Sequence, residues 1–347
     1  MTHENAPLPV ESAAPLVSVE NLSVTFRSPD KTVTVVNDVS FTLREGEALC
    51  LLGESGSGKT VTMRSLMRLL PPTAHYTGRI RLRGIDVLAL KAGQLSGIRG
   101  SLVSMIFQEP MTALDPVFTI GQQIAETVRR HDGVSHAAAR TRALDLLELV
   151  QIPSARRRLD AYPFELSGGL RQRAMIALAL SCRPRILLAD EPTTALDATV
   201  QIQVLLLLRS LQRELGMSTI FVTHDLGVAC EVADRVAIMY AGRFVEHGAV
   251  DDVLTHAAHP YTEGLLHSTV HAERQGGRLE PIGGSPPDLA ALPPGCSFEP
   301  RCVFARAACR AGMPPLSERG AGQLARCIRG SSIHEASAPV YDAEASL

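Results

Sequence analysis

Residues 53–60 constrain the fold of this chain more than any other part of the sequence. They read Gly53, Glu54, Ser55, Gly56, Ser57, Gly58, Lys59 and Thr60, between an apolar run at Ala48–Leu52 and a helical pattern at residues 60–70. A buried strand that leads through glycines into a helix is the setting of a phosphate-binding loop, or P-loop. Glycines let successive backbone amides turn toward phosphate oxygens. The alternative is a Gly-rich turn that only caps a helix, and the flanking strand favours the P-loop.

Apolar runs and helical patterns alternate through much of the chain. Residues 186–189 and 218–222 are short apolar runs typical of fully buried strands, and residues 170–181 and 198–215 carry apolar side chains at helical spacing. Alternating strands and helices are the pattern of a parallel sheet covered by helices. The sequence therefore predicts an α/β fold, with a P-loop NTPase core built on a parallel sheet.

Other segments flank or interrupt this core. Residues 17–26 and 33–43 alternate apolar and polar side chains, which predicts an N-terminal antiparallel β subdomain. Residues 109–165 lack a strong strand pattern and repeat Ala and Leu at helical intervals, which predicts a helical insertion. The expected boundaries are residues 1–15 for a disordered lead-in rich in Pro, Ala and Glu, 16–270 for the nucleotide-binding domain, and 271–347 for a small cysteine-containing extension.

Two side chains of the P-loop have expected roles in nucleotide chemistry. Lys59 should reach the β- and γ-phosphates, and the Thr60 hydroxyl should ligate Mg²⁺. The chain holds 34 basic residues, yet only Lys31, Lys59 and Lys91 are lysines. A chain that favours arginine but keeps lysine here supports this role, because a compact ammonium and a planar guanidinium are not interchangeable.

An acidic pair, Asp190 and Glu191, ends the apolar run at residues 186–189. Side chains at the carboxyl end of a parallel strand face the ligand crevice. Asp190 would hold Mg²⁺, directly or through water, and Glu191 would act as the general base that polarises an attacking water. An acidic pair at a strand end is usually a solvated turn, so it is the P-loop that favours the functional interpretation.

A second candidate anion site lies at residues 166–173, shortly before that strand. Ser167 stands where a helix needs an N-cap, and Gly168 and Gly169 expose backbone amides at a helix start. The alternative is a simple capped helix. Two phosphate-binding loops in one chain suggest that two chains share their nucleotides.

With these motifs, the sequence resembles the ATP-binding cassette (ABC) family over nearly its whole length. The matching elements, in the family's order, are the P-loop at 53–60, the Q-loop at Gln108, the signature at 166–170, Walker B at 186–191, the D-loop at 195–197 and the switch His224. The resemblance implies a head-to-tail dimer in which Ser167 and Gly169 of each chain contact the γ-phosphate on the partner's P-loop. Leu170 departs from the polar residue that many members carry, which puts side-chain contacts at that position in question.

The resemblance also implies roles for single residues. Gln108 would sense Mg²⁺ and the attacking water, His224 would contact the γ-phosphate, and Phe26 would stack on adenine. Asp197 of the D-loop joins the set that contacts nucleotide. The alternatives are a capping or core histidine at His224, a polar strand end at Gln108 and a core aromatic at Phe26.

The tail of the chain resembles a narrower group within the family. His259-Pro260-Tyr261-Thr262 and a Pro-rich stretch at 281–287 precede a cysteine-rich segment, and together they look like the ATPases of oligopeptide and dipeptide importers. The resemblance implies an ATPase subunit that energises two transmembrane permeases, which are fed by an extracytoplasmic solute-binding protein. A paralogous second ABC ATPase would be its partner. The alternatives are the same role for nickel or another small solute, and a soluble ABC ATPase outside transport.

Four of the seven cysteines, Cys296, Cys302, Cys309 and Cys327, cluster in this tail. In a cytosolic protein such a cluster indicates metal more than disulfides, although the spacings are wider than those of zinc-ribbon pairs. The resemblance implies a [4Fe–4S] cluster with four thiolate ligands. The alternative is that the cysteines act as small hydrophobes in a little domain.

Net charge and hydropathy bear on the partners and the cellular location of the protein. The net charge is −2 and the pI about 6.6, which argues against a nucleic-acid partner. No stretch approaches about eighteen consecutive apolar residues, so the chain is not expected to span a bilayer. The first residues also lack the features of a secretory signal. We therefore expect a peripheral protein on the cytoplasmic face of the cell (inner) membrane, held there by its partners.

Overall fold

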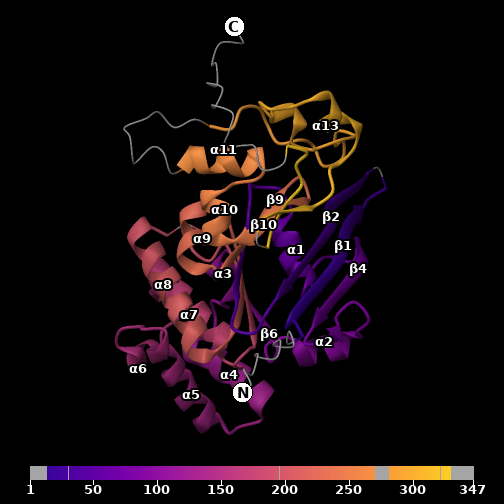
Figure 1. The fold of residues 1–347 in the computed structure, drawn as a ribbon. Helices are drawn as coiled ribbons and strands as arrows, with labels where there is room; N and C mark the ends of the chain where they lie inside the picture. The colour runs from indigo at the N-terminus through magenta and orange to yellow at the C-terminus, as the bar shows by residue number, and fades with distance from the viewer. Residues whose placement is uncertain (1–13, 30, 195, 270–280, 321, 330–347) are drawn as a thin grey trace, which may run out of the picture.

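In the computed structural model the chain forms two β-sheets, and most of the helices lie on the side away from strands β1 Val17–Arg27, β2 Thr32–Leu43 and β4 Ala74–Leu82 (Figure 1). The structure describes residues 14–29, 31–194, 196–269, 281–320 and 322–329. The lead-in predicted for residues 1–15 therefore lies outside the described residues, except for its last two positions. Ala195 of the D-loop also lies outside them.

The larger sheet contains the parallel strands that the sequence predicts, extended by antiparallel strands at one edge. Its strand order is β11-β12-β10-β9-β3-β8-β7-β6. The parallel strands are β3 Ala48–Leu52, β6 Val103–Ile106, β7 Ile186–Asp190, β8 Ser218–Thr223 and β9 Arg235–Tyr240. The antiparallel strands are β10 Arg243–Ala249, β11 Ser317–Gly320 and β12 Gln323–Ala325. The apolar runs predict β3, β7 and β8, whereas the other strands of this sheet were not expected.

Strand β3 divides its side chains between two hydrophobic cores. Cys50 and Leu52 lie in one cluster, and Leu49 and Leu51 lie in the other, because successive side chains of a strand point to opposite faces. All five residues of β3 are buried, which explains the continuous apolar run. The P-loop therefore begins in the packed centre of the molecule.

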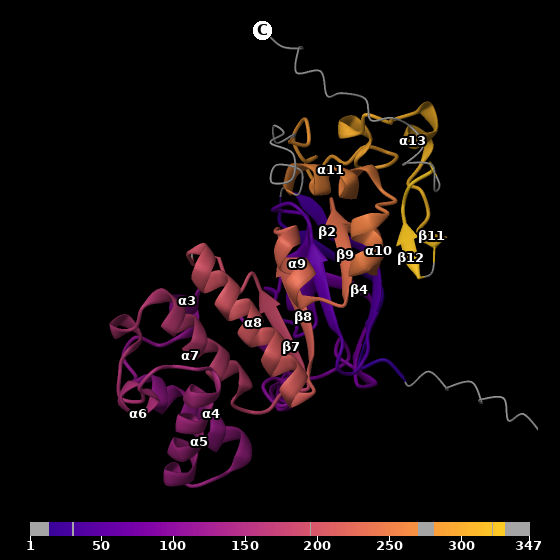
Figure 2. The same ribbon diagram turned by 60° about the vertical axis from the view of Figure 1, so that its left-hand side comes forward.

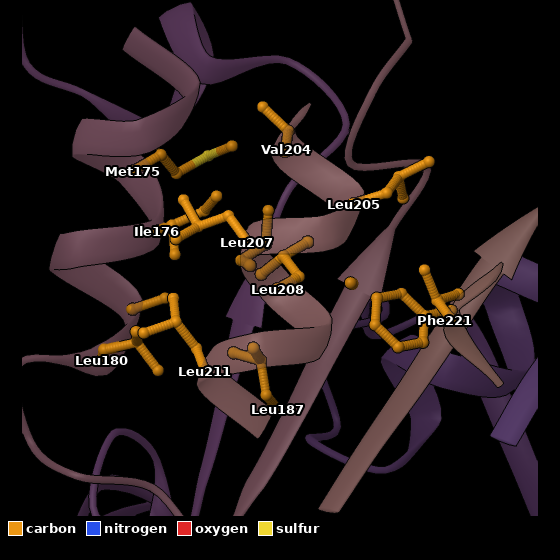
Figure 3. Close-up of a cluster of buried hydrophobic side chains, with 14 of the residues drawn as sticks. Met175, Ile176, Leu180, Leu187, Val204, Leu205, Leu207, Leu208, Leu211 and Phe221 are labelled. Atoms are coloured by element: carbon orange, nitrogen blue, oxygen red, sulfur yellow. The ribbon is translucent and has the colours of Figure 1, made fainter. Parts of the chain in front are cut away.

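Two long helices, α7 Gly168–Leu180 and α8 Ala198–Leu215, belong to the first of these cores. Figure 2 shows them side by side next to the central sheet. Figure 3 shows Ile176 and Leu180 of α7 facing Leu211 of α8. Helical spacing of apolar side chains predicted both helices, and their packing buries that apolar face.

The smaller sheet is antiparallel, as the sequence predicts, with the order β2-β1-β4-β5. Its strands are β1 Val17–Arg27, β2 Thr32–Leu43, β4 Ala74–Leu82 and β5 Ile85–Asp86. Alternation of apolar and polar residues predicts β1 and β2, but β4, which pairs along the other edge of β1, was not expected. The sheet shares its hydrophobic cluster with Leu49 and Leu51 of β3 and with Met63 of α1 Lys59–Ser65.

Helices fill most of the stretch between β6 and α7, as predicted for residues 109–165. They are α3 Pro110–Ala113, α4 Ile120–Asp132, α5 His136–Leu149, α6 Ala155–Arg158 and the 3-10 helix η1 Pro163–Glu165. Figure 2 shows this group on one side of the molecule, with α11 Pro260–Thr269 at the opposite end. The remaining helices described are α2 Ala92–Ile98, α9 Leu226–Val232, α10 Val250–Thr255, η2 Glu299–Arg301 and α13 Ala307–Ala311.

The C-terminal extension adds to the edge of the larger sheet, because its strand β12 pairs with β10. The fully buried Glu246 carboxylate of β10 helps to fasten it. This carboxylate accepts a hydrogen bond from the His259 amide at 2.9 Å and another from the Gln323 side chain at 2.7 Å. The His-Pro-Tyr-Thr motif of the tail is therefore anchored to the ATPase core rather than free of it.

Candidate nucleotide-binding site and catalytic cluster

The P-loop follows β3 in a backbone conformation that requires glycine. Gly53 has φ +156°, and a Cβ atom there would lie 2.1 Å from the Met239 carbonyl oxygen of β9. Gly58 has φ +106°, and a Cβ atom there would lie 2.8 Å from the Val35 carbonyl oxygen of β2. These glycines let the loop pass close against neighbouring backbone while it turns into α1.

Alanine at Gly53 should destabilise the protein by about 3 kcal/mol or more, because the Met239 backbone has to shift. Gly56 is the matched control. It also has positive φ, at +78°, but a Cβ atom there meets nothing within 4 Å, so Gly56→Ala should cost only about 1–2 kcal/mol. Urea unfolding of the two variants measures the difference. Equal losses would show that the close backbone approach at Gly53 is not what demands glycine.

Lys59 is buried, with 5% of its surface exposed. Its ammonium donates to the Gly53 carbonyl at 2.6 Å and to the Glu54 carbonyl at 2.9 Å. Burial lowers the pKa of Lys59, and the nearby Glu191 and Asp190 carboxylates oppose that shift. An ammonium has three donors, so one is left for a phosphate oxygen.

Asp190 ends β7 next to Thr60. Its carboxylate is fully buried and accepts a hydrogen bond from the Thr60 hydroxyl at 2.8 Å. Arg64 of α1 lies 3.4 Å from its other oxygen. Burial raises the pKa of Asp190, and the contacts with Thr60 and Arg64 lower it in part. Of the three side chains that the sequence assigns to Mg²⁺, Thr60 and Asp190 are therefore adjacent, whereas Gln108 donates to Glu191. The oxygen atoms of Thr60 and Asp190 are of the hard type that this ion prefers.

Glu191 lies at the centre of a polar cluster. Its carboxylate accepts a hydrogen bond from the Gln108 amide at 3.0 Å and another from the Thr194 hydroxyl at 2.9 Å. His224 Nδ1 lies 3.4 Å from its other oxygen. The structure thus brings together the three residues that the sequence assigns to catalysis, from segments that follow β6, β7 and β8.

Sequence reasoning missed Thr194 in this cluster. The residue stands three positions after Glu191, and its backbone amide donates to the Glu191 carbonyl at 3.2 Å. Glu191 itself has φ +43°, a conformation that non-glycine residues rarely adopt. A turn that begins at Glu191 therefore carries the Thr194 hydroxyl back to the carboxylate, and hydroxyl residues shortly after the acidic pair were the available signal.

Ser167 occupies the N-cap position of α7, where the sequence predicts it, but its hydroxyl makes no cap hydrogen bond. Ser167 and Gly168 are exposed. Gly169 packs against α8, since a Cβ atom there would lie 2.7 Å from a Val200 methyl carbon. Asp197 caps α8, because its carboxylate accepts from the Val200 amide at 3.0 Å. The start of α7 therefore presents an unused hydroxyl and helix-start amides to the surface.

Phe26 lies in β1, opposite Val33 of β2 and Ala74 of β4. It is half-buried and packs against the hydrophobic cluster of the smaller sheet. A cavity of about 320 Å³ opens beside the P-loop, and Val33 rather than Phe26 is among its lining residues. The contact of Phe26 with adenine remains a prediction. The structure shows the alternative role, in which Phe26 packs against the hydrophobic cluster.

The four tail cysteines, Cys296, Cys302, Cys309 and Cys327, line one cavity of about 20 Å³. Burial raises the pKa of the Cys302 thiol to about 11, and it also raises the pKa of Cys296 and Cys327. Within the described ranges, no group of three or more His, Cys, Asp or Glu side chains is arranged so as to hold a metal ion. The cysteines converge, but the cavity between them is no larger than a water molecule needs.

Two protein-family models match the chain. The ABC transporter model matches residues 36–194, and the model of the oligopeptide/dipeptide transporter C-terminal region matches residues 245–309. A protein of Brucella abortus (strain 2308), provisionally named a peptide import ATP-binding protein, is 49% identical over 335 residues, which cover 93% of this chain and 99% of that relative. This chain belongs to the ABC transporter ATPase family.

Further relatives of this ABC ATPase agree. The oligopeptide transport ATP-binding protein OppD of Salmonella typhimurium (strain LT2) is 45% identical over 328 residues, which cover 94% of this chain and 97% of OppD. The dimeric ATP-binding cassette MJ0796, in a post-hydrolysis state bound to ADP and Pi, matches with TM-score 0.61 and 29% identity over 67% of this chain and 98% of that one. The fold and the ATPase activity expected from the motifs are confirmed.

The ABC ATPase carries no membrane span in the part of the chain that the structure describes. None of its helices there combines the length with the apolar character that crossing a bilayer requires.

Proposed function

We propose that this ABC ATPase powers the uptake of oligopeptides or dipeptides. The observation that carries the ATPase part is the polar cluster of Gln108, Glu191 and His224 beside the Thr60–Asp190 pair and the P-loop. The peptide part is supported by the two relatives named for peptide and oligopeptide transport, whose length the chain covers almost entirely. The C-terminal family match at residues 245–309 supports it further.

In the proposed mechanism the P-loop amides and Lys59 bind the β- and γ-phosphates of ATP. Thr60, Asp190 and Gln108 would hold Mg²⁺, which would neutralise part of the phosphate charge when bound. Glu191 takes a proton from the attacking water as general base. Gln108 and His224 hold the Glu191 carboxylate in place and line the position of the γ-phosphate.

The site is proposed to be shared between two ABC ATPases. Gln108 and His224 are exposed, so the catalytic cluster lies at an open surface that a second chain can cover. Ser167 and Gly169 of that second chain would contact the γ-phosphate, and their counterparts here would do the same for the partner. The solved dimeric cassette bound to ADP and Pi supports this arrangement. We propose a paralogue as the second ATPase.

The proposed complex also contains two transmembrane permeases, and an extracytoplasmic solute-binding protein delivers the cargo. This places the ABC ATPase as a peripheral protein on the cytoplasmic face of the cell membrane, with residues 16–270 as its nucleotide-binding domain and residues 271–347 as its extension. No nucleic-acid partner is proposed. Nickel or another small solute is the alternative cargo, and a soluble role outside transport is the alternative to import.

Affinity purification from gently solubilised membranes of the host tests the partners. The proposal expects the ABC ATPase to copurify with two multi-spanning permeases and a second ABC ATPase. A tagged, unrelated cytosolic protein serves as the control for carry-over. Recovery of soluble partners alone would reject the transporter assignment and leave an ABC ATPase outside transport.

For the four tail cysteines we propose a [4Fe–4S] cluster. Their convergence on one cavity from positions 296 to 327 supports this, and thiolates are the ligands that such clusters use. The cavity of about 20 Å³ is too small for a cluster as it stands, so the surrounding loops would have to open. The cysteine-lined cavity takes no part in the proposed hydrolysis.

Anaerobic purification followed by iron, sulfide and zinc analysis tests the cluster. We expect about four irons per chain, and a Cys302→Ser and Cys309→Ser double variant should lose most of them. A Cys50→Ser variant is the control, since Cys50 lies in the core of β3 far from the tail in sequence. Absence of stoichiometric metal would leave the cysteines as small, half-buried hydrophobes.

A further inference from the structure

Arg301 of the C-terminal extension forms a partly buried ion pair with Glu54 of the P-loop. Its guanidinium donates to the two carboxylate oxygens of Glu54 at 2.8 and 3.0 Å. The Arg301 side chain is only 5% exposed. A planar guanidinium that binds both oxygens of a carboxylate fixes its orientation as well as its distance.

The remaining N–H groups of the Arg301 guanidinium also donate hydrogen bonds. Nε donates to the Gly283 carbonyl at 2.8 Å, Nη2 to the Ile282 carbonyl at 3.3 Å and Nη1 to the Tyr240 hydroxyl at 3.3 Å. Together with the bonds to Glu54, these use all five N–H donors of the guanidinium. The group also lies over the rings of Tyr240 and Phe298, at 5.8 and 5.9 Å from their centroids. Arg301 is therefore held in one position.

Glu54 connects the fixed Arg301 side chain to the groups that are expected to bind phosphate. Its backbone amide donates to the Tyr261 hydroxyl of the tail motif at 2.9 Å. Its carbonyl accepts from the Lys59 ammonium at 2.9 Å and from the Ser57 amide at 3.2 Å. Arg301 of the extension and Tyr261 of the His-Pro-Tyr-Thr motif thus fix the side chain and the amide of the same residue whose carbonyl positions Lys59.

The extension also forms a wall of the cavity beside the P-loop. This cavity of about 320 Å³ is lined on one side by Val33 and residues 54–57, and on the other by residues 286–289 of the extension. Asp288 in that wall pairs with Lys31, whose ammonium lies 3.5 Å from its carboxylate. A cleft of this size is within the range that small-molecule sites occupy. The extension therefore borders the nucleotide site directly.

We infer that Arg301 is a positioning residue for nucleotide binding, which holds the P-loop through Glu54 and makes the C-terminal extension part of the nucleotide site of its own chain. This inference rests on the proposed nucleotide-binding role of the P-loop. It assigns to the extension a function within the ATPase itself, separate from any contact with a partner and from any metal at the cysteines.

The test compares ATP binding by purified variants of the full chain, measured by isothermal titration. Arg301→Gln should weaken ATP binding about 10- to 100-fold, because the P-loop loses its anchor. Arg301→Lys should restore binding only in part, since an ammonium cannot reproduce the paired bonds. Arg310→Gln is the control: it removes another ion pair of the extension, with Glu299 at 2.8 Å, and should leave ATP affinity unchanged.

A double variant keeps the test decisive if Arg301→Gln folds poorly. Glu54→Gln together with Arg301→Gln leaves no unpaired charge, so the double variant should fold. Its ATP affinity should be no lower than the affinity of whichever single variant, Glu54→Gln or Arg301→Gln, binds ATP more weakly. In the assembled complex the same variants should raise KM for ATP while kcat changes little, which a general loss of folded protein would not do.

The outcomes separate the inference from the function on which it rests. If Lys59→Ala abolishes ATP binding while the folded double variant binds like the native chain, the P-loop function stands and the role of Arg301 is overturned. If Lys59→Ala itself binds ATP normally, the proposed nucleotide site is wrong. A fall in affinity for the Arg301 variants with none for Arg310→Gln establishes the positioning role.

Discussion

Glu191→Gln should lower the ATPase rate of the assembled complex about 100- to 10,000-fold while ATP binding remains. The amide keeps the shape of the side chain, so the contacts with Gln108 and Thr194 can largely persist. It cannot take a proton from water, and only the chemical step is lost. A complex that binds ATP without hydrolysing it should accumulate in the closed dimeric state.

Steady-state ATPase assays and equilibrium ATP binding on the same preparation measure the two parts. Glu214→Gln is the matched control, because Glu214 lies at the far end of α8, where its carboxylate accepts a hydrogen bond from the Ser210 hydroxyl at 2.7 Å. A native hydrolysis rate in the Glu191 variant would refute the general-base assignment. Loss of ATP binding would instead show that Glu191 supports the structure of the site.

Lys59→Ala should weaken ATP binding by about 100-fold or more and so abolish turnover at ordinary ATP concentrations. The substitution removes a buried ammonium that joins the Gly53 and Glu54 carbonyls and has one donor to spare. It also removes a positive charge close to Asp190 and Glu191, which disfavours a polyanionic ligand.

Titration calorimetry with ATP measures the loss. Lys91→Ala removes one of the other lysines at an exposed position and should bind ATP like the native chain. Unchanged affinity in the Lys59 variant would contradict the P-loop role directly. A drop in both variants would point to net charge rather than to a specific contact.

The parts of the fold that the sequence predicted are those whose burial is local and uniform. Strands β3, β7 and β8 are buried at every position, so each stands out as an apolar run. Strand β6 is only four residues long, and β4 has four exposed positions among its nine, so neither gives a clear pattern. Strand β12 has three residues and exists because a distant segment, β10, offers it an edge.

The residues of the candidate site also fall into those that the sequence predicted and those that only the structure revealed. Gln108, Glu191 and His224 could be named because each stands in a motif with a fixed order along the chain. Thr194 belongs to none of these motifs, and a turn in the chain brings its hydroxyl to the Glu191 carboxylate. Arg301 could not be found at all, since its partner Glu54 lies 247 positions away and nothing around Arg301 marks it. Contacts of this kind depend on tertiary packing and appear only in the folded chain.

The central claim is that this ABC ATPase powers peptide import, and transport by the reconstituted complex tests it most directly. Proteoliposomes would contain the ABC ATPase, its copurified partners and the solute-binding protein, with ATP on the side of the ATPase and a labelled oligopeptide on the other. We predict ATP-dependent movement of the peptide toward the ATPase side, abolished by Glu191→Gln in this chain. ATP hydrolysis that no peptide stimulates, with no movement of peptide, would contradict the claim.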